Sequence, residues 1–220
     1  MATQTQTFTA SGTWTCPANT YNVQVECWGG GKTGNGSGGD EGYAGTGGGG
    51  GAYAKSLAIP VTPLANYIVT VGPASGTSTF VGNDSAKCEA IGCSTQSGAS
   101  ASSCTGDIRY SGGDGGIGYH PNQNYGSGGG GGEGACSSQN GHNAYQSGYD
   151  NPSHGGDGCD GGDGGSCTSL NGDPGSIPGG GGAGGSYSYG SKGSGGSGAG
   201  GQIILTWTPT LTNAFLWQDF

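Results

Sequence analysis

Residues 36–51 read GSGGDEGYAGTGGGGG, with glycine at every third position from Gly36 to Gly51. A period of three matches neither the 3.6 residues per turn of an α-helix nor the two-residue repeat of a strand. It is the period of the polyproline II helix, which has three residues per turn and no internal hydrogen bonds. Collagen shares this spacing, but these runs contain almost no proline. We therefore predict polyglycine II helices whose bare backbones pack side by side.

The same spacing returns in five later runs, at residues 112–118, 128–134, 155–164, 179–185 and 195–201. Peptide groups buried in such a bundle need hydrogen-bond partners, and these can come only from neighbouring runs. Glycine also loses more conformational entropy on ordering than any other residue. The bundle should therefore need a folded clamp at its roots.

Strand-like segments flank the glycine runs. Residues 7–15, 21–28, 53–61, 66–72 and 202–208 alternate or are rich in Val, Thr, Tyr and Trp. Because these segments come from both ends of the chain, we predict a small β-sandwich that clamps the bundle. No segment has the periodicity of an amphipathic helix. The predicted fold class is mostly β and irregular, with no α-helix of note.

The predicted organisation has three parts. The β-module comprises 1–28, 53–82 and 202–209, the glycine-rich bundle with its loops comprises 29–52 and 83–201, and a C-terminal docking tail comprises 210–220.

The direction of each run follows from the strands that it joins. The first run leaves a strand at Trp28 and returns at Tyr53, so it is a hairpin, bent within 40–46. The last run, 195–201, leads into a strand and therefore travels toward the sandwich. Counting backward with alternating direction places loops 135–154 and 186–194 at the far tip, and loops 119–127 and 166–178 near the sandwich.

Composition excludes several classes of protein. The chain has 220 residues, 57 of them glycine, and only 30% hydrophobic residues, so disorder is the alternative to an ordered bundle. A net charge of −9 with five basic residues argues against nucleic-acid binding. No apolar stretch reaches transmembrane length, and the first ten residues lack a signal-peptide core. We therefore predict no membrane insertion.

Eight cysteines allow 105 disulfide pairings, so the connectivity cannot be read from the sequence. None forms a C-x-x-C pair, which argues against a zinc site. Two alternatives stay open: disulfides formed in an oxidising medium, and small buried residues.

Two short motifs resemble ligand-binding loops and fail on inspection. Lys32 and Thr33 end like a phosphate-binding loop, but Glu26 stands where the first glycine is needed and no helix follows. Residues 155–160, GGDGCD, begin like a calcium-binding β-helix repeat, but Gly162 replaces the large aliphatic residue.

Three acidic residues, Asp157, Asp160 and Asp163, follow the three-residue period and share one face. A rise of about 3.1 Å per residue spaces them about 9 Å apart, too far to share one calcium ion. We interpret them as a solvated acidic edge, with a calcium bridge to a neighbouring loop as the alternative. No nucleophile elbow lies near the histidines. We therefore predict no enzyme activity, no cofactor and no metal centre.

The order of segments carries a family resemblance. FTASGTWTCP, VQVECWGGG, GGGGGAY and YIVTVG are followed by glycine runs and GAGGQIILTW. From Phe8 to Thr208 the chain resembles the glycine-rich domains of phage tail fibres and related bacterial surface proteins. The bundle is similar to the polyglycine II sandwich of the adhesins at the tips of some T-even-like phage tail fibres, in which variable tip loops bind the host receptor. The eight cysteines depart from that pattern. Those adhesins also carry a larger N-terminal attachment domain, whereas here we expect only the sandwich.

The resemblance implies receptor binding by the predicted tip loops, which hold aromatic, hydrogen-bonding side chains. The candidate receptor-binding residues are Tyr43, Tyr145, Tyr149, His154, Tyr187 and Tyr189. The alternative is that these rings fold back to cover exposed glycine backbone.

The tail after the last strand is unusually apolar. Its candidate virion-docking residues are Leu211, Phe215, Leu216, Trp217 and Phe220. Exposed, such a cluster would dock to another virion component or to copies of the chain itself. The alternative is that it packs on the sandwich edge.

The leading hypothesis is a non-enzymatic phage virion protein that acts as a tail-fibre or tip adhesin. Its expected partners are other virion proteins and a host surface glycan or outer-membrane protein, and it is expected to be oligomeric in the particle. The expected location is the virion surface, extracellular after lysis. A capsid decoration or head-fibre protein is the alternative. Ice binding ranks lower, because the positions between glycines vary too much for a flat, regular array.

Overall fold

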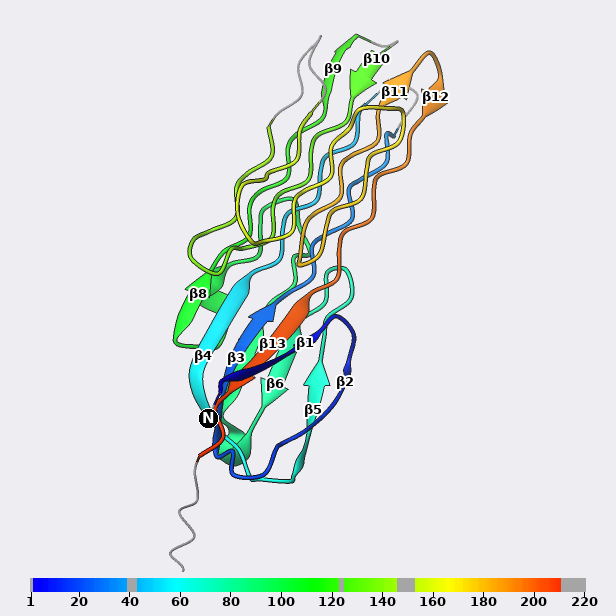
Figure 1. The fold of residues 1–220 in the computed structure, drawn as a ribbon. Coiled ribbons are helices and arrows are strands. Elements are labelled where there is room, and N and C mark those ends of the chain that lie inside the picture. The colour runs from blue at the N-terminus through cyan, green and yellow to red at the C-terminus, as the bar shows by residue number, and fades with distance from the viewer. Residues whose placement is uncertain (1, 39–42, 123–124, 146–152, 211–220) are drawn as a thin grey trace, which may run out of the picture.

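The computed structural model describes residues 2–38, 43–122, 125–145 and 153–210. A two-sheet sandwich forms one end of the molecule, and a bundle of extended runs leads from it to a small sheet at the opposite tip (Figure 1). The described residues contain no α-helix, only two 3-10 turns at Asn83–Ser85 and Ala101–Ser103. The predicted fold class is confirmed.

The first sheet of the sandwich joins the two ends of the chain. Its order is β1 (Gln4–Phe8), β13 (Gln202–Trp207), β3 (Asn22–Trp28), β4 (Tyr53–Pro60) and β8 (Ile108–Tyr110). β13 lies antiparallel between β1 and β3. The predicted pairing of the C-terminal strand with the N-terminal ones is therefore confirmed.

The second sheet has the order β2 (Gly12–Thr15), β5 (Asn66–Thr70), β6 (Ser78–Val81) and β7 (Lys87–Ala90). The single strand predicted over 7–15 is in fact β1 and β2, which belong to different sheets. The chain crosses from one sheet to the other at residues 9–11, where Ser11 Oγ accepts from Val71 N at 3.0 Å. β6, β7 and β8 were not predicted.

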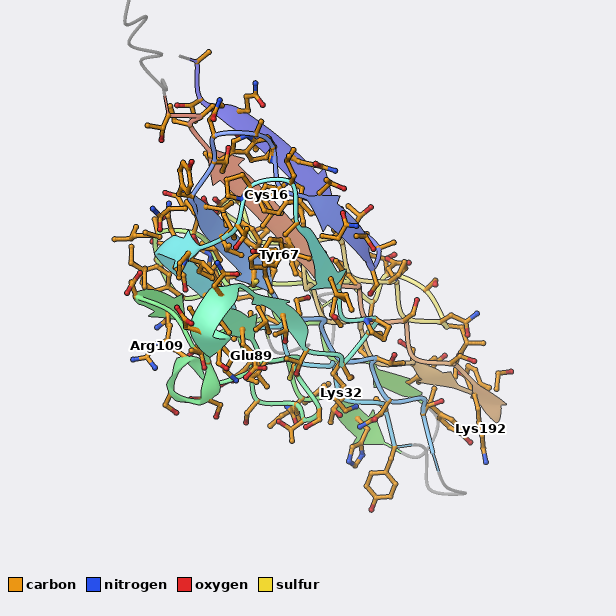
Figure 2. All side chains as sticks on the ribbon, turned by 90° about the horizontal axis from the view of Figure 1, so that it is seen from below. Cys16, Lys32, Tyr67, Glu89, Arg109 and Lys192 are labelled. Carbon is orange, nitrogen blue, oxygen red and sulfur yellow. A yellow bond between two sulfur atoms is a disulfide. The ribbon has the colours of Figure 1, made fainter. Side chains whose placement is uncertain are left out.

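An aromatic cluster fills the space between the two sheets. The Trp14 ring lies 6.0 Å from the rings of both Tyr67 and Phe80, and 5.4 Å from that of Trp207. Along their strands these positions alternate with half-buried or exposed ones, and this alternation is what made the strands predictable from the sequence. Figure 2 shows the side chains crowded around Tyr67 in this part of the molecule.

Five of the six free cysteines belong to this core and behave as small buried residues: Cys16, Cys27, Cys88, Cys93 and Cys104. Burial raises the pKa of Cys27 well above its ordinary value, and it also raises the pKa of Cys93 and Cys104. These three groups therefore stay uncharged thiols at neutral pH.

Hydrogen bonds between neighbouring runs hold the bundle together, and they repeat with the period of the sequence. Gly31 N donates to Ala199 O and Gly34 N to Gly196 O, each at 2.9 Å. Three residues apart again, Gly45, Gly48 and Gly51 donate to a second run at 2.8–2.9 Å, through the carbonyls of Gly185, Gly182 and Gly179. Each step of three advances one turn, as expected of polyglycine II helices.

Close contact between backbones explains the glycine requirement. A Cβ added to Gly50 would overlap the carbonyl of Glu133, and one added to Gly131 would overlap the carbonyl of Gly181. In both cases the obstacle is backbone, which cannot rotate away as a side chain can. The three-residue period therefore marks the positions at which the backbones of neighbouring runs are in contact.

The junction between sandwich and bundle is a second, smaller cluster. The rings of Trp28 and Tyr53 lie 4.8 Å apart, and Trp28 Nε1 donates to Ala135 O at 2.9 Å. Tyr53 donates its hydroxyl proton to Glu26 at 2.7 Å. Large side chains at the end of β3 and the start of β4 thus clamp the roots of the glycine runs, as predicted.

The predicted direction of several runs is wrong. Loop 119–127 lies at the tip, where β10 (Tyr125–Ser127) pairs with β9 (Tyr119–Asn122) and with β11 (Tyr187–Ser188). Residues 135–140, predicted at the tip, lie beside the sandwich, because Asn140 Oδ1 accepts from Ser111 N at 2.9 Å. Loop 166–178 is divided: Leu170 O accepts from Ser186 N near the tip, whereas Pro178 lies at the sandwich end.

Three unrecognised changes of direction cause this error. Residues 141–145 and 172–177 are runs in their own right, bonded to neighbours at Ser111, Asp114, Ser194 and Ser197. The stretch 155–164 is a hairpin rather than one run, since Gly164 N donates to Gly156 O at 2.9 Å. An odd number of missed reversals inverts every direction assigned before them in the chain.

Candidate functional site

The tip of the molecule is a four-stranded sheet built from two hairpins far apart in sequence. Its order is β12 (Ser191–Lys192), β11, β10 and β9. Tyr125 pairs with Ser188, and Tyr187 pairs with Lys192. The sheet closes the end of the bundle opposite the sandwich (Figure 1).

The two-residue turn between β11 and β12 carries an exposed tyrosine. Tyr189 has φ +42° and Gly190 has φ +84°. Positive φ at both central residues is typical of a type I′ hairpin turn, and it is uncommon for a bulky residue. The Tyr189 side chain is 70% exposed, and its ring meets the Tyr125 ring edge-on at 4.6 Å. Tyr125 is itself 42% exposed.

A second ring pair comes from two other segments. Tyr43 bridges to Gly38 across the first hairpin, and its ring meets that of His120 at 4.6 Å with an angle of 69°. Tyr43 is 49% exposed and His120 is exposed as well. Four exposed rings from three hairpins therefore lie at the tip. We call this set (Tyr43, His120, Tyr125 and Tyr189) the tip aromatic set.

The structure divides the predicted receptor-binding residues among different places. Tyr43 and Tyr189 belong to the tip aromatic set, whereas Tyr187, in β11 of the tip sheet, is buried. Tyr145 and His154 are exposed and adjacent, since Tyr145 N donates to His154 O at 3.1 Å. Tyr149 lies outside the described residues, as do Leu211, Phe215, Leu216, Trp217 and Phe220 of the docking tail.

Sequence reasoning missed His120 and Tyr125, because the run count placed loop 119–127 near the sandwich. The signal was present: residues 119–125 read YHPNQNY, which is as rich in aromatic and hydrogen-bonding side chains as the loops that were chosen. For Tyr187, the buried ring fits the alternative that these rings cover glycine backbone.

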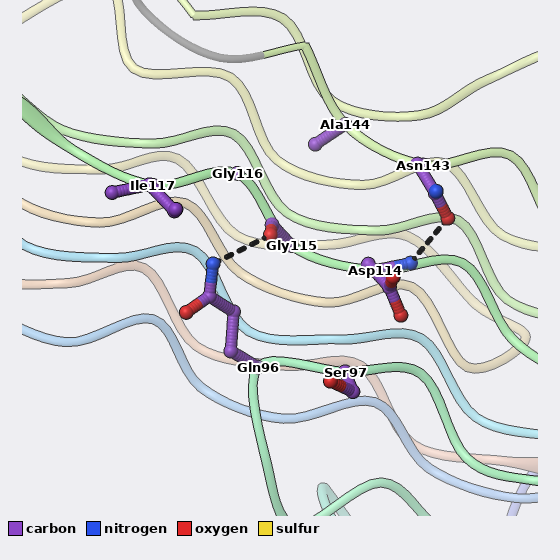
Figure 3. Close-up of a pocket in the computed structure, with 8 residues that line it drawn as sticks. All are labelled: Gln96, Ser97, Asp114, Gly115, Gly116, Ile117, Asn143 and Ala144. Atoms are coloured by element: carbon purple, nitrogen blue, oxygen red, sulfur yellow. Dashed lines mark hydrogen bonds between the residues drawn. The ribbon is translucent and has the colours of Figure 1, made fainter.

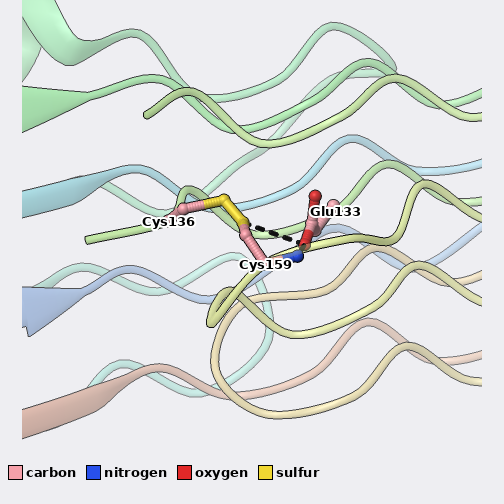
Figure 4. Close-up of side chains that lie close together, drawn as sticks. All are labelled: Glu133, Cys136 and Cys159. Carbon is pink, nitrogen blue, oxygen red and sulfur yellow. Dashed lines mark hydrogen bonds between the residues drawn. A yellow bond between two sulfur atoms is a disulfide. The ribbon is translucent and has the colours of Figure 1, made fainter. Parts of the chain in front are cut away.

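A buried carboxylate and a disulfide hold together the turns at the sandwich end of the bundle (Figure 4). Glu133 is fully buried and accepts from His142 N at 2.9 Å and from Cys159 N at 3.0 Å. His142 Nδ1 lies 2.6 Å from the same carboxylate. Cys159 is bonded to Cys136. Residues 133–142 and the turn that holds Cys159 are therefore joined at one point.

The ligand atoms of Glu133, Cys136 and Cys159 lie within 4.8 Å of one another, close enough to face a single metal ion. Zinc binding by cysteine needs thiolates, and here both sulfurs are joined in a disulfide. The arrangement is therefore that of a covalent and hydrogen-bonded cross-link. Asp160 strengthens it, because its carboxylate accepts from Ser137 N at 2.8 Å and from the Ser137 hydroxyl.

The pairing of His142 with a buried carboxylate resembles the way in which enzymes orient a catalytic histidine. Such a histidine needs a nucleophile or substrate proton at its other ring nitrogen. In the described part of the chain, His142 Nε2 meets only the side-chain amide of Gln139, at 3.4 Å. In this geometry His142 makes a structural contact with Glu133.

A family model described as a glycine-rich domain matches residues 3–208, nearly the whole chain. No curated protein gives a match. Within the described residues, no helix has both the length and the apolar character needed to cross a membrane.

Proposed function

The chain belongs to the glycine-rich domain family, and from that premise we propose that it is a phage virion protein, a tail-fibre or tip adhesin that binds a host surface receptor. The receptor is a surface glycan or an outer-membrane protein. The tip aromatic set makes the contact, and the bundle serves as the stalk that carries it.

The observation that carries this proposal is the exposure of four rings on a scaffold bonded through its backbone. Aromatic side chains dominate binding energy at protein interfaces, where truncating one costs about 2 kcal/mol or more. Tyrosine offers a stacking face and a hydroxyl at low entropic cost. Rings in the tip set already contact one another in pairs, so binding would cost little further ordering.

The placement of the C-terminal tail and the tip at opposite ends of the molecule also supports the proposal. Thr210, the last described residue, donates its amide proton to Asn19 O at 2.7 Å, at the end of the sandwich farthest from the tip. A tail leaving from this end could join the virion while the tip faces outward. Deleting residues 210–220 should then leave a folded protein that no longer joins the particle or its oligomer, whereas normal incorporation would count against docking by the tail.

The proposal can be tested by binding the purified protein to host cells. We expect the double substitution Tyr125→Ala and Tyr189→Ala to weaken cell binding by more than about tenfold, as loss of a hot spot requires. The matched control is Tyr21→Ala, because Tyr21 is 52% exposed but lies on the sandwich. Thermal stability should be nearly the same in both variants.

Unchanged cell binding in the double variant would contradict the adhesin proposal. It would favour the alternative, a capsid decoration or head-fibre protein that binds no specific receptor. Equal losses in the tip variant and in Tyr21→Ala would also contradict it, since binding would then not be localised at the tip.

A further inference from the structure

A groove of about 390 Å³ opens on the side of the bundle, and Figure 3 shows the residues that line it. Polar side chains line it from three segments: Gln96 and Ser97, Asp114, and Asn143. Ile117, which is 55% exposed, supplies an apolar wall. The volume lies within the range of about 300–1,000 Å³ that is usual for small-molecule sites.

The backbone of the bundle holds these side chains in place. Gly98 N donates to Asp114 Oδ1 at 2.8 Å, and Asp114 N donates to Asn143 Oδ1 at 2.7 Å. Gln96 Nε2 donates to Gly115 O at 2.9 Å. Each of the three side chains is therefore fixed by one polar atom. Ligand binding would therefore cost little further conformational entropy in these side chains.

Each fixed side chain keeps a second polar atom for a ligand. These atoms are Asp114 Oδ2, Asn143 Nδ2 and Gln96 Oε1, and among the described residues no hydrogen bond reaches them. Two are acceptors and one is a donor, and the Ser97 hydroxyl can act as either. Together they suit a ligand that carries several hydroxyl groups beside an apolar face.

We propose that this groove binds a neutral sugar residue. A ring hydroxyl donates to Asp114 Oδ2 in a charge-assisted hydrogen bond, the strongest kind available here. A neighbouring hydroxyl accepts from Asn143 Nδ2, and the C–H face of the ring packs on Ile117. The site is distinct from the tip aromatic set, so it does not depend on the function proposed for the tip.

Other classes of ligand fit the groove less well. An anion would meet the Asp114 carboxylate and a chain of net charge −9. Calcium needs six to eight oxygen ligands, and the groove has a single carboxylate. An added peptide strand needs open backbone groups, whereas Gly115 and Gly116 both donate to neighbouring runs.

The proposal predicts binding of simple glycosides. The probes are the methyl glycosides of glucose, galactose, mannose and N-acetylglucosamine, measured by saturation-transfer NMR on the full chain. We expect at least one to bind with a dissociation constant of about 1 mM, an affinity that a few hydrogen bonds can supply. The methyl ester of sialic acid and free sialic acid form a pair that tests the exclusion of anions, with the ester binding better.

The central variant is Asp114→Asn, which keeps the Oδ1 acceptor for Gly98 N and replaces the second oxygen with a donor. It should weaken glycoside binding by about tenfold or more, as loss of a charge-assisted bond does. Asp157→Asn is the matched control, because it removes the same charge from another exposed site on the bundle. Ile117→Ala should also weaken binding, by a smaller factor.

Three results would overturn the proposal: no signal from any of the glycosides, equal binding by Asp114→Asn and the wild type, or equal losses in Asp114→Asn and Asp157→Asn. Melting temperatures of the variants show whether each has folded. If Asp114→Asn fails to fold, Asn143→Asp supplies the same test, since it keeps the acceptor for Asp114 N and removes the donor.

Discussion

The sandwich and the bundle are stable for opposite reasons. In the sandwich, large side chains such as Trp14 and Phe80 are buried between sheets, and their removal from water stabilises the fold. In the bundle, runs such as 47–51 have no side chains to bury, and their peptide groups bond directly to neighbouring runs. The same chain therefore contains one region that needs side chains and one that needs their absence.

This difference reverses the usual rule for substitutions. In an ordinary core the damaging change removes atoms and leaves a cavity. In the bundle the damaging change adds a single carbon where two backbones touch. The difference also separates two roles within the molecule. The bundle fixes the distance between the sandwich and the tip, while the side chains that could contact a ligand lie at the tip and on the flanks of the bundle.

The largest effect should come from adding a methyl group inside the bundle. Gly131→Ala places a Cβ against the carbonyl of Gly181, and we expect it to cost more than about 4 kcal/mol, in the range reserved for severe overpacking or strain. Thermal unfolding followed by circular dichroism measures it. Gly38→Ala is the control, because a Cβ there meets nothing within 4 Å. Similar melting temperatures for the two variants would contradict the packing described.

In the sandwich the corresponding experiment removes atoms. Phe80→Ala should destabilise the protein by about 3–5 kcal/mol, as large-to-small changes of buried aromatic residues do. Leu57→Ala, at a side chain that is 55% exposed, should change stability by less than about 0.5 kcal/mol. Urea titration gives both values. A small loss in Phe80→Ala would mean that the sandwich core is less important than its packing indicates.

The disulfide sharpens the comparison, because it links two turns of the bundle and none of the sandwich. Its partners are separated by 23 residues, so replacing Cys136 and Cys159 by serine should cost about 3 kcal/mol by loop-closure entropy. Amide exchange should rise in residues 128–165 and not in the sandwich strands. A reducing agent should reproduce this effect in the wild type and leave the double variant unchanged. If exchange rose equally in both regions, the two would be one cooperative unit.

The smallest predicted effect concerns charge on the flank of the bundle. Burial raises the pKa of Asp163, and the nearby Glu133 and Asp157 carboxylates raise it further. A raised folded-state pKa means that ionised Asp163 destabilises the fold at neutral pH, and that this cost disappears as the pH falls below the unfolded value. Asp163→Asn should therefore melt about 1–2 °C higher at pH 7, with no difference near about pH 3. A higher melting temperature at both pH values would point to a cause other than charge.

Much of this fold could be predicted because its contacts leave a periodic trace. Glycine spacing marked where runs touch, and alternation at β3, β5 and β13 marked the sandwich. The runs at 141–145 and 172–177 were missed because each spans too few repeats, with Gly141 and Ala144 in one and Gly172 and Gly175 in the other. Together with the unrecognised hairpin at 155–164, they make three missed reversals, and this odd number inverted the direction assigned to loop 119–127.

The candidate sites were less predictable than the scaffold. His120 and Tyr125 reach the tip only because of how many times the chain reverses, which no local pattern records. The Cys136–Cys159 pair is one of many possible pairings. The side groove requires Gln96, Asp114 and Asn143 from three runs to meet. In each case the missing information is which run neighbours which, and glycine carries no side chain to encode it.

Residue-resolved hydrogen exchange of the glycine amides tests the central claim most directly, namely that backbone bonds between runs hold the bundle rigid. We predict that Gly48, Gly132 and Gly182, each bonded to a neighbouring run at 2.9 Å, exchange as slowly as the amides of β3 and β13. Gly190, in the exposed tip turn, should exchange rapidly. If the amides of the runs exchanged as fast as that of Gly190, the bundle would not be a hydrogen-bonded structure and the account would be wrong.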